Sequence, residues 1–133
     1  MLTVKTDKKE NRFHGALQYI GEYRGIKAAA IIDSEGMVID YWGKDDFDPE
    51  HFSPLAILML DNINSVLRRL NERPANMVII KNKDSWLTLH RISDVILAVN
   101  AEIETDDLLR VRISQAAEMV RSYLNDKYPL LVR

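Results

Sequence analysis

The sequence has no cysteine among its 133 residues and contains only five glycines and four prolines. Without cysteine there is no disulfide framework, no thiolate metal site and no cysteine nucleophile. This composition fits a reducing cytosol. The glycines stand at positions 15, 21, 25, 36 and 43. That spacing allows neither a GxGxxG loop nor a Walker loop, so the sequence predicts no phosphate-cradling turn.

Neither sign of charge predominates, since 18 basic residues face 20 acidic ones. No long basic run is present, so we do not expect electrostatic capture of nucleic acid or of an anionic membrane. No apolar run approaches the roughly 18 residues of a membrane-spanning helix. The charged start, MLTVKTDKKENR, lacks the apolar region of a signal peptide. We therefore expect a cytoplasmic protein with no membrane insertion.

Catalytic and metal-binding patterns are also missing. The three histidines, at positions 14, 51 and 90, form no HExxH or H-x-x-x-H motif, and no GxSxG motif occurs. The acidic segment from Asp45 to Glu50 lacks the register of a calcium-binding loop. We interpret it as a solvated loop and the histidines as surface or sheet residues. The sequence thus predicts no enzyme, no catalytic residue, no cofactor and no metal site.

Hydrophobic periodicity and turn residues divide the chain into eight elements in the order α-β-β-α-β-β-β-α. We expect helices over 11–24, 53–71 and 105–124, and strands over 26–33, 37–42, 76–82, 85–92 and 95–101. Residues 1–10 and 125–133 are expected to be tails around a single domain, 11–124. The third helix is expected to begin with Thr105 as its N-cap.

The segments IKAAAIID (26–33) and VILAVNA (95–101) are apolar with little alternation. Such runs are typical of strands covered on both faces. Short turns join the strands, and Asp33-Ser34-Glu35-Gly36 is the clearest of them, because Asp bonds the following backbone and Gly supplies positive φ. The sequence therefore predicts an α+β fold, in which an antiparallel hairpin and a three-stranded antiparallel meander are covered by helices on both sides.

The middle helix contains LAILML (55–60), six consecutive apolar residues that cover more than one turn. We expect this helix to start with Ser53 as N-cap, because a start at Asp48 would place Pro54 beyond the first turn and remove a hydrogen bond. A helical wheel predicts a broad face against the sheet and leaves Ile57 and Leu58 outside it, where a partner would cover them. The predicted sheet-facing residues are Phe52, Leu55, Ala56, Met59, Leu60, Ile63, Val66, Leu67 and Leu70.

The third strand reads MVIIK, with Lys81 as its one charged residue. An exposed edge of this kind invites aggregation unless it is paired, and pairing with its own copy across a two-fold axis would remove it. The alternative is a strand that is simply half-buried. Sequence alone leaves both interpretations open.

Three stretches carry a family resemblance: GIKAAAIIDSEGMVIDY (25–41), LTLHRISDVILAVNA (87–101) and DDLLRVRISQAAEMV (106–120). In their order, and over nearly the whole chain, they resemble the roadblock/dynein light chain family and, within it, the MglB-like regulators of small GTPases. The resemblance implies an α/β/α sandwich around a five-stranded antiparallel sheet, with helices 1 and 3 on one face and helix 2 on the other. It also implies a homodimer joined through the third strand and the middle helices, which binds and regulates a small Ras-like GTPase.

Two sets of residues on the middle helix and third strand are expected to make these contacts. The expected dimer interface comprises Leu55, Ile57, Leu58, Asp61, Met77, Val78, Ile79, Ile80 and Lys81. The expected GTPase contact comprises Asp61, Asn64, Ser65 and Arg68, although the Arg68-Arg69 pair also answers the helix C-terminal dipole. An assembly adaptor without effect on GTP turnover is the alternative function. A ligand sensor is disfavoured because no convergent polar pocket can be written from the sequence.

Overall fold

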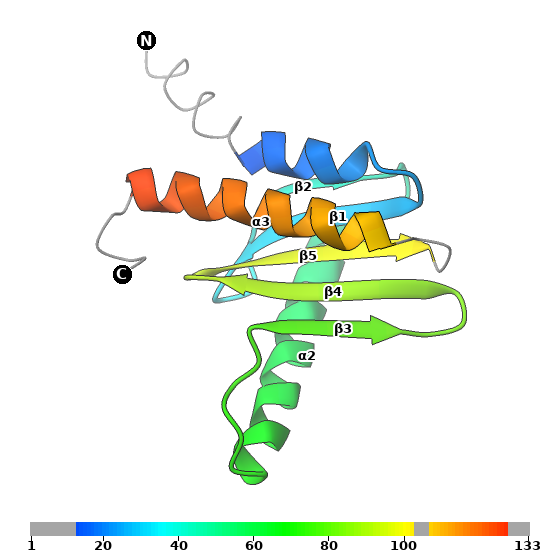
Figure 1. The fold of residues 1–133 in the computed structure, drawn as a ribbon. Helices are drawn as coiled ribbons and strands as arrows, with labels where there is room; N and C mark the ends of the chain where they lie inside the picture. The colour runs from blue at the N-terminus through cyan, green and yellow to red at the C-terminus, as the bar shows by residue number, and fades with distance from the viewer. Residues whose placement is uncertain (1–12, 103–106, 128–133) are drawn as a thin grey trace.

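A five-stranded antiparallel sheet with helices on both faces forms the protein (Figure 1). The computed structural model describes residues 13–102 and 107–127. The strands, in the order β2-β1-β5-β4-β3, are β1 (Ile26–Asp33), β2 (Val38–Gly43), β3 (Met77–Lys81), β4 (Ser85–Ile92) and β5 (Val95–Glu102). The helices are a first helix described over 13–21, α2 (Pro49–Arg69) and α3 (Asp107–Lys127). The expected fold class and element order are confirmed.

Strands β1 and β5 are buried on both faces, as their unbroken apolar runs predict. Their side chains alternate between two hydrophobic clusters. One cluster joins the sheet to the first helix and α3, and the other joins it to α2. Figure 1 shows the first helix and α3 side by side over one face, with α2 on the opposite face.

The hairpin between β1 and β2 closes as its sequence predicts. The Asp33 carboxylate accepts hydrogen bonds from the backbone N–H groups of Glu35 and Met37, both at 2.9 Å. Gly36 adopts φ +88°, a left-handed conformation that other residues rarely take. These local interactions help to set the β1–β2 register.

Helix α2 starts earlier than we expected from the sequence, so the predicted N-cap at Ser53 is wrong. Its N-cap is Asp48, whose side chain accepts from the N–H groups of Glu50 and His51, and Pro49 is the first helical residue. Pro54 lies inside the helix and removes one hydrogen bond of the series. A capped N-terminus with proline at its preferred first position outweighs that loss.

The sheet-facing side of α2 is also rotated from the predicted one. The buried residues are Ser53, Ala56 and Leu60, and Ile57 is half-buried against the same cluster. Leu55, Val66 and Leu70, which we expected against the sheet, are exposed. Small side chains at positions 53 and 56 let the helix approach the sheet closely, and this close approach sets the rotation.

The first helix is held to α3 by aromatic and arginine contacts. Phe13 packs edge-on against Tyr123, with ring centroids 4.7 Å apart. The Arg112 guanidinium lies 4.2 Å from the Tyr19 ring centroid and donates a hydrogen bond to the Tyr19 carbonyl oxygen. Helix α3 continues to Lys127, inside the segment expected to be a tail. The predicted Thr105 cap, the tail at 1–10 and residues 128–133 lie outside the described residues.

Candidate interaction surface

The outward side of α2 carries an apolar stripe. Leu55, Leu58, Val66 and Leu70 are 47%, 55%, 56% and 64% exposed. Leu55, Leu58 and Val66 recur at helical spacing on the side away from the buried residues Ser53, Ala56 and Leu60, and Leu70 is the C-cap residue just after the helix. Single exposed leucines are ordinary, but four exposed apolar side chains along one helix and its cap mark a surface that favours a partner. We call these four residues the α2 stripe.

The α2 stripe continues onto a part of the helix that the sheet does not cover. Helix α2 lies closest to β1 and β2, and in Figure 1 its C-terminal half extends well past β3. None of its residues after Leu60 is buried. Because this half has no sheet beneath it, its apolar residues cannot be satisfied by the protein's own core.

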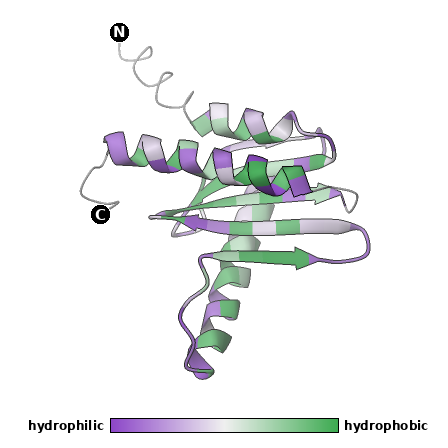
Figure 2. Cartoon of the chain, viewed as in Figure 1, coloured by the Kyte–Doolittle hydropathy of each residue, from purple (hydrophilic) through white to green (hydrophobic). Residues whose placement is uncertain are grey.

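The β3 edge is the second part of the surface. Strand β3 pairs with β4 on one side only and stands at the end of the sheet, as the sequence predicted. Figure 2 shows it as apolar over most of its length. Met77 and Ile79 are exposed on the face shared with α3, Val78 and Ile80 are half-buried, and Lys81 is exposed.

The structure places most of the expected interface residues on one side of the molecule. The C-terminal half of α2, which contains Asp61, passes the β3 edge, so this half of the helix and β3 lie on the same side of the molecule (Figure 1). Leu58 is exposed, as expected. Ile57 differs, because it packs beside the β1–β2 turn, where Gly36 lies in van der Waals reach of its Cγ1.

The four residues expected to contact a GTPase lie on the overhanging half of α2. Asp61 and Arg68 are exposed and Ser65 is half-buried. Asn64 has a structural role, since its Oδ1 accepts a 2.8 Å hydrogen bond from the backbone N–H of Ala75. That bond ties the segment after α2 back onto the helix, and it leaves Asn64 less free for a partner than its neighbours.

Sequence reasoning missed two features of the surface. Ile39 and Tyr41 of β2 are exposed on the face that carries α2, and Asp40 between them contacts His14 of the first helix. On α3, Leu108, Val111 and Met119 are exposed. The alternation of β2 could have indicated its exposed face. The Asp40–His14 contact spans 26 positions and carries no local signal.

No three histidine, aspartate or glutamate side chains among residues 13–102 and 107–127 are grouped to hold a metal ion. Burial lowers the pKa of His90 from its usual 6.5, with Arg121 adding to the effect and Glu118 opposing it. The Nδ1 atom of His90 is buried without a hydrogen-bond partner, so His90 does not activate a hydroxyl nucleophile through that atom.

No helix in the described part of the chain is long and apolar enough to cross a membrane.

Comparison with known proteins gives a fold but no close relative. No family model and no curated protein sequence matches the chain. Among solved structures, MglB of Myxococcus xanthus superposes with a TM-score of 0.79 at 16% identity, covering 88% of this chain and 90% of that one. The gliding protein MglB of Thermus thermophilus gives 0.77 at 15% identity, with 89% and 92% covered.

A roadblock/LC7 domain from Streptomyces avermitilis matches with a TM-score of 0.71 at 22% identity, over 80% of this chain and 92% of that one. These similarities run through the whole arrangement of sheet and helices, while the sequences have diverged. The chain therefore has the roadblock/LC7 fold in its MglB-like form.

Proposed function

We propose that this protein is a non-enzymatic homodimeric platform in the cytoplasm that binds and regulates a small Ras-like GTPase. The observation that carries the proposal is the pairing of an open β3 edge with the α2 stripe on one side of the molecule. The MglB-like fold supports it.

The dimer would form by antiparallel pairing of β3 with its own copy. This arrangement removes the free edge of each sheet and creates one continuous sheet across a two-fold axis. It also brings the overhanging halves of both α2 helices together, so that Leu58 and Val66 would be covered. Burying each such side chain stabilises the dimer by roughly 1.5–3 kcal/mol. Leu55, Ile57, Asp61 and the residues of β3 complete the proposed interface.

The GTPase would bind across the paired α2 helices and contact Asp61, Ser65 and Arg68. Asn64 would act there mainly through its bond to Ala75. A regulator without catalytic groups of its own would act by repositioning the switch residues of the GTPase. This mode needs no arginine finger from the protein.

The proposal is tested with the Ras-like GTPases of the same organism, loaded with GDP or with a GTP analogue. We expect binding to one of them that depends on the nucleotide, and a changed rate of single-turnover GTP hydrolysis. Arg68→Ala should weaken binding several-fold. Arg24→Ala, which removes an exposed arginine away from α2, should not. Binding to no GTPase would contradict the proposal.

An assembly adaptor is the second candidate, and the overhanging α2 stripe favours it equally. Such a dimer would bind its partner in both nucleotide states and leave hydrolysis unchanged. The same two measurements therefore separate the candidates. A gene for a P-loop GTPase next to the gene for this chain would favour regulation.

A further inference from the structure

Strand β2, at the opposite edge of the sheet from β3, carries a capped backbone amide. An edge strand directs every second N–H group away from the sheet, where another strand can pair with it. The N–H of Tyr41 is bonded instead to Oδ1 of the neighbouring Asp40, at 2.8 Å. Tyr41 lies near the middle of β2, so the cap removes a donor that an added strand would need.

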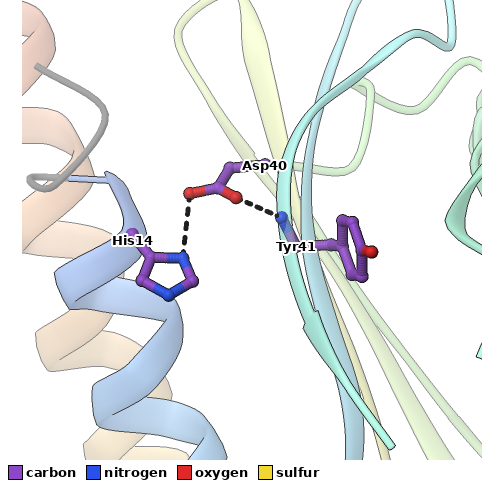
Figure 3. Close-up of polar contacts among 3 residues, drawn as sticks. All are labelled: His14, Asp40 and Tyr41. Carbon is purple, nitrogen blue, oxygen red and sulfur yellow. Dashed lines mark hydrogen bonds and ion pairs between the residues drawn. The ribbon is translucent and has the colours of Figure 1, made fainter. Parts of the chain in front are cut away.

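The Asp40 carboxylate is held in place from a second element. Its Oδ2 lies 3.2 Å from Nδ1 of His14 on the first helix (Figure 3). Because a carboxylate only accepts hydrogen bonds, His14 carries the proton on Nδ1 in this contact. One carboxylate thus bridges the helix and the strand and keeps its other oxygen on the Tyr41 amide. His14 is a positioning residue for the cap.

A β-bulge adds a second obstacle on the same strand. Ile31 of β1 pairs with Asp40, and the next residue, Ile32, pairs with Val38. Ile39 is therefore skipped in the β1–β2 register. A bulge bends the strand and breaks the regular spacing of its outward amides, which is a common way to prevent edge pairing.

The need for such protection follows from the side chains. Ile39 and Tyr41 of β2 are exposed, as is Met37 just before the strand. An apolar edge without protection would recruit a second copy by antiparallel self-pairing. In β3, by contrast, no hydrogen bond from a side chain to the strand backbone occurs within the described residues, and the strand has no bulge.

We propose that β2 is a second self-pairing edge of this protein, and that Asp40, oriented by His14, keeps it closed to another copy of the chain. Two edges that could both self-pair would let sheets add without limit, because each added copy would offer a new edge. With the β2 edge capped, only β3 can pair with another copy, so assembly stops at two chains. The identity of the open edge rests on the dimer proposed above, whereas the role of Asp40 does not.

The test compares Asp40→Ala with Asp40→Asn by light scattering over a range of protein concentrations. Alanine removes the cap, and we expect a mass that rises with concentration to at least twice that of the wild type. Asparagine keeps an oxygen acceptor for the Tyr41 amide, and we expect the wild-type mass. Every comparison is with the wild type's own mass, so the test remains valid if the wild type proves to be a monomer.

Two further measurements separate edge pairing from general loss of structure. Ile39→Lys added to Asp40→Ala places a charge on the edge, and we expect it to restore the wild-type mass. Hydrogen exchange at the Tyr41 amide should be slow in the wild type and in the Asp40→Ala assembly, but fast in the double variant. An Asp40→Ala protein that melts cooperatively yet keeps the wild-type mass at every concentration would overturn the proposal. Larger species that Ile39→Lys does not disperse would also overturn it.

Discussion

At the scale of single residues, Gly21 marks a close approach between the first helix and the sheet. A Cβ built at this position would lie 2.4 Å from ring atoms of Trp42 on β2. We predict that Gly21→Ala destabilises the protein by about 1–3 kcal/mol, because the indole must move out of a packed site. Thermal or urea unfolding measures this change.

Gly15 provides the control on the same helix. A Cβ there meets nothing within 4 Å. Gly15→Ala should stabilise the protein by about 0.5–1 kcal/mol, since alanine loses less backbone entropy on entering a helix. Equal effects of the two substitutions would show that the Trp42 contact does not constrain position 21.

His90 gives a pH dependence whose sign follows from its burial. Its pKa is lowered in the folded state from the usual 6.5. Below pH 6.5 the unfolded chain therefore binds more protons than the folded protein, and stability rises with pH across that window. We predict that stability falls as the pH drops from 6.5 towards the lowered pKa, and that His90→Gln removes much of this slope.

The effect of His90 on stability between pH 5 and pH 7 can be separated from that of the carboxylates, because aspartate and glutamate titrate mainly near pH 4. Urea unfolding of the wild type and His90→Gln between pH 5 and pH 7 measures the two slopes. Identical slopes would show that burial of His90 is not coupled to folding.

At the scale of elements, α2 shows where sequence patterns stop being sufficient. Its existence and its end near residue 70 follow from apolar spacing and from Pro74. The sequence predicts a start at Ser53, because Pro54 inside a helix removes a hydrogen bond. The helix starts at Pro49 instead, since the Asp48 N-cap stabilises it by more than that loss. Its rotation was misplaced because LAILML is apolar all round, so periodicity cannot say which residues meet the sheet.

The start of α2 can be tested by a matched pair of substitutions. Asp48→Ala removes the observed cap, and we predict a loss of about 0.5–2 kcal/mol of stability. Ser53→Ala should be neutral or slightly stabilising, because the Ser53 Oγ is buried without a hydrogen-bond partner. If the helix began at Ser53, the order of the two effects would be reversed.

At the scale of the whole molecule, the fold was predictable because each strand carries its own signal. The unbroken apolar runs of β1 and β5 indicated strands covered on both faces, and the short turns indicated the β1–β2 hairpin and the β3–β4–β5 meander. The joining of both into one sheet followed from the family resemblance. The candidate site was predictable only in part. Whether Leu55 and Val66 face the sheet depends on the rotation of α2 about its axis, which is set by packing between distant segments.

Contacts between distant segments also explain the rest of what the sequence could not show. The bond from Asn64 to Ala75 and the contact of His14 with Asp40 each join elements by geometry rather than by local pattern. The same geometry gives the two edges of the sheet different properties, with β3 open and β2 capped. The proposed function therefore depends on a homodimer that forms through β3 and α2.

The homodimer is tested most directly by light scattering, which gives the solution mass of the wild type and of Leu58→Asp. We predict that the wild type has twice the 15.3 kDa chain mass, and that Leu58→Asp has the mass of a single chain. Leu108→Asp, at an exposed leucine of α3 on the other face of the sheet, should leave the dimer intact. A wild-type mass of one chain, or a dimer that Leu58→Asp leaves unchanged, would contradict the account.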